Sequence, residues 1–166
     1  MKKILVSCCL LFSWACDGQA NKTLKDSVFQ KGDVIRTTQI SFGLSHPLGG
    51  RFELDSVKPI ADFLRRYPEL HVEVAVHTDS RGSSEGNFHL SNSRADAIKD
   101  VLIHDFQIDS FRISKRGYGE SKLIINNNQI EKAKNKEEQN KLHNINRRTE
   151  LIVTDIKTSG NHLLKK

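Results

Sequence analysis

The chain has 166 residues, of which 37% are hydrophobic and 28% are charged, and its formal net charge is +6. This composition is typical of one soluble globular domain with additional segments, and the chain is long enough to bury a core. Its basic residues are not interleaved with aromatic ones as in a single-strand nucleic-acid platform, so nucleic acid is not expected as a partner.

The first 15 residues have the features of an export signal. Lys2 and Lys3 precede the uncharged run "ILVSCCLLFSWA", which has the length of a secretory h-region and is too short to span a bilayer. We therefore expect residues 1–15 to be a signal peptide. Loss of the two lysines lowers the formal net charge from +6 to +4. This excess suits an anionic surface, such as a cell-wall polymer or lipid headgroups.

All three cysteines lie within or directly after this leader, at Cys8, Cys9 and Cys16. The folded part therefore has no thiol for a disulfide, a zinc site or a cysteine nucleophile. Cys16 follows Ala15 at the end of the hydrophobic run, an arrangement that resembles a bacterial lipoprotein signal whose cysteine is acylated. The alternative is an ordinary secretory signal with an incidental cysteine. We expect residues 16–33 to be a lipidated N-terminus and a flexible tether.

The predicted domain, residues 34–156, begins with a strand and an amphipathic helix. "VIRTTQISF" is rich in β-branched residues and precedes a loop rich in glycine and proline. Asp55 or Ser56 is expected to cap the helix, with Pro59 in its first turn, where the missing N–H costs little. The helix should bury one stripe, made of Val57, Ile60, Ala61 and Leu64.

A second strand and a long helix follow. "HVEVAVH" alternates strictly, which predicts a strand with its valines on one face. The chain then turns and forms a helix to about His104, with Ser83 or Ser84 as the cap. Arg94 lies on the apolar stripe of this helix, and a buried guanidinium needs an acidic partner. The other members of that stripe are Leu90, Ala97 and Val101.

The last third contributes two strands and a polar helical segment. "RISKRGY" and "RTELIVTD" read as strands, whereas "QIEKAKNKEEQNKL" is helical by propensity but polar nearly all round. That segment should be an exposed helix or a loosely held excursion, and residues 157–166 should form a basic tail. The element order predicts an α+β domain of the βαβαβ type, with a small mixed sheet of about four strands and two main helices packed on one face.

Three stretches resemble one known family. They are "HTDSRGSSEGNFHLSNSRADAIKDVL", "RISKRGYGES" and "NRRTELIV". They are similar to the pattern T-D-x-x-G, N-x-x-L-S-x-x-R-A, R-I-x-x-x-G-x-G and N-R-R-x-E of the peptidoglycan-binding domains of OmpA and the Pal lipoprotein. The resemblance implies a non-catalytic domain without cofactor or metal. It would bind the peptide stem of peptidoglycan and tether the outer membrane to the cell wall, facing the periplasm.

In that family an aspartate and an arginine hold the two ends of the diaminopimelate side chain, and the matching positions are Asp79 and Arg94. Asp79 follows the strand 71–77 at its carboxyl end, where α/β sheets commonly place ligands. A ligand with an ammonium and a carboxylate needs an anion at one end and a fork-shaped cation at the other. The alternative is that Asp79 and Arg94 form an internal salt bridge that holds the loop to the helix.

Three further residues are candidate contacts to peptidoglycan. The backbone N–H of Thr78 can contribute to binding a carboxylate. Asn87 lies about two helical turns before Arg94 on the same face. Arg147 matches the N-R-R motif, where a structural role is at least as well supported, and strand alternation should send it and Arg148 to opposite faces.

The sequence departs from the family pattern at two positions. Many members end the first strand in an aspartate that also contacts the ligand, but this chain has Gly43 there. An arginine is common three residues before the asparagine of N-R-R, where this chain has His143. We therefore expect weaker binding, or preference for a different stem peptide.

An enzyme is the alternative function. His77 and Asp79 form an H-x-D fragment that could ligate a metal, and His71 lies at the other end of the same strand, but no third ligand stands at a convincing spacing. The sequence has no G-x-S-x-G elbow, P-loop or H-E-x-x-H motif. The alternative is thus a periplasmic hydrolase or metal-dependent enzyme acting on cell-wall material. A flagellar-motor stator would require a transmembrane helix, which this sequence lacks.

Overall fold

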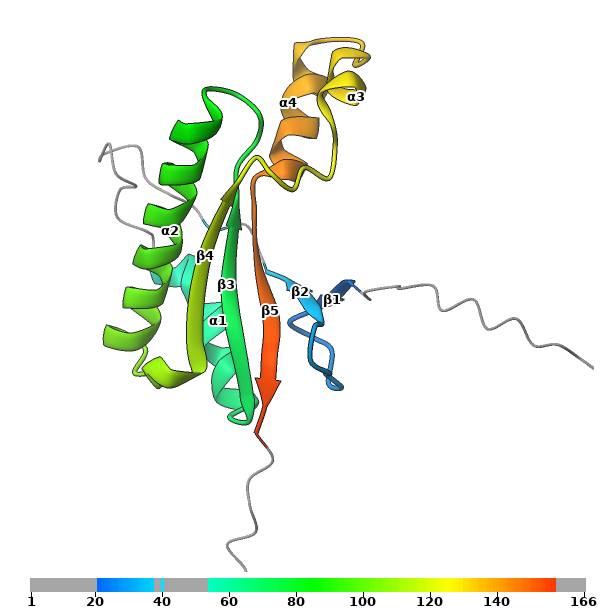
Figure 1. Ribbon diagram of the computed structural model, residues 1–166. Coiled ribbons are helices and arrows are strands. Elements are labelled where there is room, and N and C mark those ends of the chain that lie inside the picture. The colour runs from blue at the N-terminus through cyan, green and yellow to red at the C-terminus, as the bar shows by residue number, and fades with distance from the viewer. Residues whose placement is uncertain (1–20, 38–39, 41–53, 158–166) are drawn as a thin grey trace, which may run out of the picture.

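Five strands form one mixed sheet, in the order β1-β2-β5-β3-β4 (Figure 1). The computed structural model describes residues 21–37, 40 and 54–157. The expected signal peptide, Cys16, Gly43 and nearly all of the basic tail lie outside these residues. The predicted mixed sheet is confirmed, with one strand more than expected.

Three of the strands form the centre of the domain and one of its edges. They are β3 (Leu70–His77), β4 (Ile113–Gly119) and β5 (Arg148–Ile156). β3 runs parallel to β4 and antiparallel to β5. The carboxyl ends of β3 and β4 therefore meet the amino end of β5 at one end of the sheet. This arrangement decides which loops form the candidate site.

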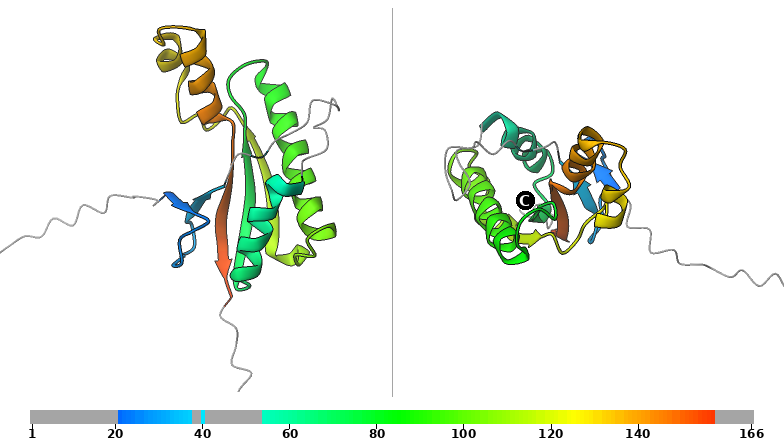
Figure 2. Two further views of the ribbon diagram at one scale, coloured as in Figure 1. Left: turned by 180° about the vertical axis from the view of Figure 1, so that it is seen from behind. Right: turned by 90° about the horizontal axis from the view of Figure 1, so that it is seen from above.

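Two long helices, α1 (Leu54–Arg66) and α2 (Ser84–His104), cover one face of this sheet (Figure 2). The alternation of β3 places its valines on that face, where they are almost fully buried. They pack with the predicted stripe of α1 in one core cluster. The members of that cluster from β3 and α1 include Val72, Val74, Val76, Val57, Ile60, Ala61 and Leu64.

The first helix begins earlier than expected. Because α1 starts at Leu54, Asp55 and Ser56 lie inside its first turn instead of capping it. Pro59 is therefore in the second turn and not in the first. Proline has no N–H to donate to the carbonyl four residues earlier, so one intrahelical hydrogen bond is absent. This loss is confined to the N-terminal end of the helix, where N–H groups lack intrahelical partners in any case, and the helix continues.

The buried stripe of α2 differs from the predicted one. Ser83 is the N-cap, and its side chain accepts a hydrogen bond from the Gly86 backbone N–H at 3.1 Å, as expected of a capping serine. The predicted stripe at Leu90, Ala97 and Val101 is only half-buried. The fully buried positions lie beside it, at Asn87, Ser91, Ala95, Ile98 and Leu102.

The polar segment before β5 forms two short helices instead of one. α3 (Asn127–Glu131) and α4 (Lys136–Asn146) stand beyond the end of the sheet, away from the α1–α2 layer (Figure 1). Fully buried Asn146, the last residue of α4, is hydrogen-bonded to the chain just before α3. Its Oδ1 accepts hydrogen bonds from the backbone N–H groups of Ile124 and Ile125, both at 2.9 Å.

The fifth strand lies where a tether was expected. β1 (Asn21–Thr23) pairs in parallel with β2 (Val34–Arg36), and β2 pairs antiparallel with β5. The Lys22 Nζ lies 2.6 Å from a carboxylate oxygen of buried Asp33. Phe29 packs edge-on against Phe63 of α1, with ring centroids 5.3 Å apart. These tertiary contacts hold a segment whose own sequence has no strand periodicity.

Candidate functional site

The candidate site lies where β3 ends and β5 begins. Asp79 follows β3, and Arg147 directly precedes β5. Because the two strands are antiparallel neighbours, these residues meet although they are far apart in the sequence. The Arg147 Nη1 donates a hydrogen bond to Asp79 Oδ2 at 2.7 Å. The structure thus brings together two of the five predicted ligand contacts by strand pairing alone.

Asp79 is also bound by Arg81, a residue that the sequence did not indicate. The Arg81 backbone N–H donates to Asp79 Oδ1 at 3.0 Å, and its Nη2 donates to Oδ2 at 2.7 Å. The Arg81 Nε lies 3.2 Å from both oxygens. The residue two positions after an aspartate in a loop can fold back in this way, which is the only signal the sequence held.

These contacts keep the Asp79 carboxylate ionised. The side chain is almost buried, and burial by itself would raise its pKa. The hydrogen bonds from Arg81 and Arg147 outweigh burial and lower the pKa of Asp79 to about 2. At neutral pH the site therefore presents a fixed negative charge at the carboxyl end of β3.

Arg94 supplies positive charge near this carboxylate. Its side chain is half-buried on α2, one turn after buried Ser91. Burial lowers the pKa of Arg94, the charge of Arg147 lowers it further, and the charge of Asp79 opposes both effects. A guanidinium stays protonated under these conditions, so Arg94 and Arg147 both carry positive charge, and the charge of Arg94 interacts with that of Asp79. Asp79 forms ion pairs with Arg81 and Arg147, both at 2.7 Å.

Two of the groups predicted to contact peptidoglycan form hydrogen bonds within the protein instead. The Thr78 backbone N–H donates to the Gly119 carbonyl at 2.9 Å, so it cannot bind a ligand carboxylate. The Asn87 Nδ2 donates to the carbonyls of Asp79 at 3.1 Å and Arg81 at 3.2 Å, and also to Glu120 Oε2. Asn87 thus fixes the loop that carries Asp79. The Thr78 hydroxyl is buried beside Asp79 and has no hydrogen-bond partner among the described residues.

Arg148 and His143 flank the site in different ways. Arg148 points away from Asp79, as strand alternation predicts. It does not extend into solvent, because its Nε donates a hydrogen bond to Glu150 Oε1 at 2.8 Å. Burial and the positive charge of Arg81 lower the pKa of His143 below its usual value. His143 therefore adds little positive charge at neutral pH.

The H-x-D fragment does not gather metal ligands. His77 is buried, its ring stacks on Tyr118 with centroids 5.0 Å apart, and its Nε2 lies 3.2 Å from Glu150 Oε2. The oxygen lies off the N–H direction, so this contact is an ion-pair distance without hydrogen-bond geometry. Within 21–37, 40 and 54–157, no group of three His, Cys, Asp or Glu side chains could hold a metal. In the same ranges no helix has the length and apolar character needed to cross a membrane.

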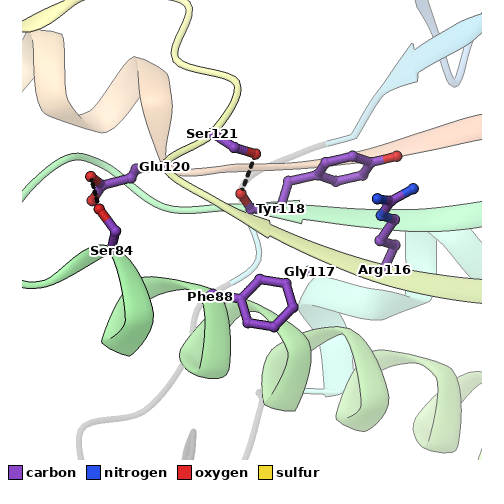
Figure 3. Close-up of a pocket in the computed structure, with 7 residues that line it drawn as sticks. All are labelled: Ser84, Phe88, Arg116, Gly117, Tyr118, Glu120 and Ser121. Atoms are coloured by element: carbon purple, nitrogen blue, oxygen red, sulfur yellow. Dashed lines mark hydrogen bonds between the residues drawn. The ribbon is translucent and has the colours of Figure 1, made fainter.

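A separate hollow lies at the free edge of β4, beside the N-terminal half of α2 (Figure 3). Its volume is about 430 Å³. Glu120 at its rim accepts a hydrogen bond from Ser84 at 2.7 Å, and its other oxygen accepts from Asn87. Both carboxylate oxygens are therefore engaged in holding α2 to the end of β4. The lining residues are Ser84, Phe88, Arg116, Gly117, Tyr118, Glu120 and Ser121.

Several known proteins are similar to part of this chain. Outer membrane porin F of Pseudomonas aeruginosa is 39% identical over 71 residues, which make up 43% of this chain and 20% of the porin. The peptidoglycan-associated lipoprotein of Legionella pneumophila is 43% identical over 49 residues, or 30% of this chain and 28% of that protein. Each match thus spans less than a third of the relative.

A solved structure supports the fold. The cell wall anchor of the T6SS from Pseudomonas aeruginosa is 25% identical, with a TM-score of 0.51 over 70% of this chain and 76% of the anchor. The sequence profile described as "OmpA family" matches residues 51–137, more than half of the chain, and includes both Asp79 and Arg94. The chain therefore belongs to the OmpA family.

Proposed function

We propose that this domain holds the peptide stem of peptidoglycan without cutting it. The observation that carries the proposal is the Asp79 carboxylate, ionised and almost buried at the carboxyl end of β3, with the cations Arg94 and Arg147 beside it. The names of two similar proteins point the same way, because one is a peptidoglycan-associated lipoprotein and the other is the cell wall anchor of the T6SS.

Diaminopimelate is the ligand that this charge pattern suits. Its side chain ends in a carbon that carries both an ammonium and a carboxylate. Asp79 would accept hydrogen bonds from the ammonium, and the Arg94 guanidinium would hold the carboxylate with its planar fork. The buried Thr78 hydroxyl, which has no partner among the described residues, would bond to the same ligand.

Co-sedimentation with insoluble peptidoglycan tests this proposal. The full-length chain should sediment with the wall material, and free diaminopimelate should compete. Hydrogen bonds to charged groups contribute about 1.5–3 kcal/mol, so Asp79→Asn and Arg94→Lys should each weaken binding roughly 10- to 150-fold. Asp79→Asn removes charge with little change of shape, and Arg94→Lys removes the fork while keeping the charge.

The same assay separates the alternatives. If Asp79 and Arg94 only hold loop to helix, both variants will melt at lower temperature while their folded fraction sediments like the wild type. If the protein is a cell-wall hydrolase, soluble muropeptides will accumulate in the supernatant and will depend on His77. The binding proposal predicts an unchanged muropeptide profile, with or without added zinc.

We further propose that Cys16 is acylated and anchors the domain to the outer membrane, with the domain in the periplasm. The support is the place of Cys16 at the end of the hydrophobic leader, together with the relatives named as an outer membrane porin and a lipoprotein. Several acyl chains on one cysteine would give stable anchoring.

Metabolic labelling tests the anchor. Cells fed a labelled fatty acid should incorporate it into the wild-type chain but not into Cys16→Ala, and the variant should leave the membrane fraction. Cys8→Ala is the matched control, because it removes a cysteine from inside the leader and should keep the label. Equal labelling of wild type and Cys16→Ala would show that Cys16 is not the acylation site.

A further inference from the structure

The Asp79 carboxylate is occupied by the protein's own cations. Oδ1 accepts from the backbone N–H and the Nε of Arg81, at 3.0 and 3.2 Å. Oδ2 accepts from Arg81 Nε at 3.2 Å and Nη2 at 2.7 Å, and from Arg147 Nη1 at 2.7 Å. A carboxylate offers about four acceptor positions, so these donors leave no room for a ligand ammonium. One of them must leave before a ligand can bind there.

The two arginines are held to different extents. Arg147 is the C-cap of α4, its backbone N–H donates to the His143 carbonyl at 3.2 Å, and its guanidinium also donates to Asn144. Arg81 lies in the β3–α2 loop next to Gly82, which has a φ of 98°, and every side-chain hydrogen bond that the structure gives to Arg81 goes to Asp79. The Arg81 side chain is 49% exposed. Arg81 can therefore swing into solvent without breaking any other of these contacts.

We propose that Arg81 is a built-in competitor for the ammonium position at Asp79. This inference rests on the proposed binding of the stem peptide. In the unliganded protein the Arg81 guanidinium stands where the ligand ammonium would bind, and it keeps the nearly buried carboxylate paired. A ligand must displace it, so the measured affinity equals the intrinsic affinity multiplied by the fraction of molecules in which Arg81 has moved out.

The competitor also selects among ligands. An acetylated or amide end of the stem peptide has no charge with which to replace a guanidinium at Asp79. Only a ligand that carries a free primary ammonium can replace the ion pair between Arg81 and Asp79. Arg81 thus determines specificity without contributing a contact in the bound state.

Calorimetric titration of the full-length chain with free diaminopimelate tests this role. Removal of the competitor in Arg81→Ala and Arg81→Gln should tighten binding roughly 2- to 10-fold, the range expected for a half-exposed ion pair. Arg81→Lys should lie between these variants and the wild type, because it keeps the charge but not the fork. A mere loss of structure can only weaken binding, so a gain in affinity without a rise in melting temperature identifies competition.

Arg65→Ala is the matched control. Arg65 is 50% exposed and pairs with Asp62 on α1, so its removal changes net charge equally without touching the site. Its affinity should equal that of the wild type. If Arg81→Ala binds as the wild type does, or more weakly, Arg81 is not a competitor. If the wild type fails to bind, or Asp79→Asn binds equally well, the proposed function itself is wrong, and the two failures are thereby distinguished.

Discussion

At Gly117 the backbone of α2 comes so close to β4 that a side chain has no room. A Cβ at this position would lie 2.2 Å from the Asn92 backbone N and 2.5 Å from the Ser91 carbonyl carbon. The close approach allows two hydrogen bonds between β4 and α2. The Gly117 N–H donates to Asn92 Oδ1 at 3.1 Å, and the Gly119 N–H donates to Ser91 Oγ at 2.9 Å. Side chains of α2 thus satisfy donors on the free edge of β4 that would otherwise be available to another chain.

Gly117→Ala should therefore destabilise the domain. The new methyl group meets backbone, which cannot turn aside, so α2 must shift at a cost of about 1–3 kcal/mol. We expect a melting temperature lower by at least about 3 °C and faster hydrogen exchange at the Gly119 amide. Gly82→Ala is the control: its Cβ meets nothing within 4 Å, so only the backbone strain at φ 98° counts and Gly119 should stay protected. Unchanged exchange at Gly119 in Gly117→Ala would contradict this account.

Among the elements, those with strong internal patterns were predictable and those held by tertiary contacts were not. The strict alternation of valines predicted β3, and Ser83 was one of two caps proposed for α2. The buried stripe of α2 was missed because its first positions are Asn87 and Ser91, polar residues that bond to the β3–α2 loop and to β4. Hydrophobic periodicity cannot detect a helix face that is buried through hydrogen bonds.

The candidate site, too, could be predicted from the sequence only in part. The motif and its spacing placed Asp79 and Arg94, and antiparallel pairing of β3 with β5 explains why Arg147 reaches Asp79. Arg81 was not foreseen, because the direction of a loop side chain depends on local backbone geometry. The use of the Thr78 N–H was also missed, since its acceptor is Gly119, a residue remote in sequence. Sequence spacing therefore indicated the charges of the site but not how they are paired.

At the scale of the whole molecule, the sheet face opposite α1 and α2 carries a polar cluster in which His77 and Glu150 are buried and Tyr118 and Arg148 are half-buried. Glu150 lies 3.2 Å from His77 Nε2 and 2.8 Å from Arg148 Nε. Burial would raise the pKa of Glu150, but the contacts with His77 and Arg148 outweigh it and lower this pKa to about 2 from the ordinary 4.5. Burial lowers the pKa of His77 below 6.5, against the opposing effect of Glu150.

These shifts predict how stability depends on pH. A carboxyl group whose pKa is lowered by folding stabilises the protein fully above its unfolded pKa, and this contribution disappears as the pH falls through the folded pKa. For Glu150 the window runs from pH 4.5 down to about 2. His77 has a lowered pKa too, so its preference for the neutral form stabilises the fold above pH 6.5 and is lost as the pH falls through its folded pKa.

Glu150→Gln isolates the carboxylate from the other titrating groups. At pH 7 the variant should melt well below the wild type, because the Arg148 guanidinium loses its buried anion. The gap in melting temperature should then narrow as the pH falls from about 4.5 toward 2, since the wild type loses the same charge by protonation. Asp79 titrates in both proteins and cancels from the difference. Glu131→Gln, at an exposed position on α3, is the control, and its melting curve should follow the wild type throughout. A gap between Glu150→Gln and wild type that stays constant from pH 7 to 2 would show that the cluster stabilises the sheet by packing and not by charge.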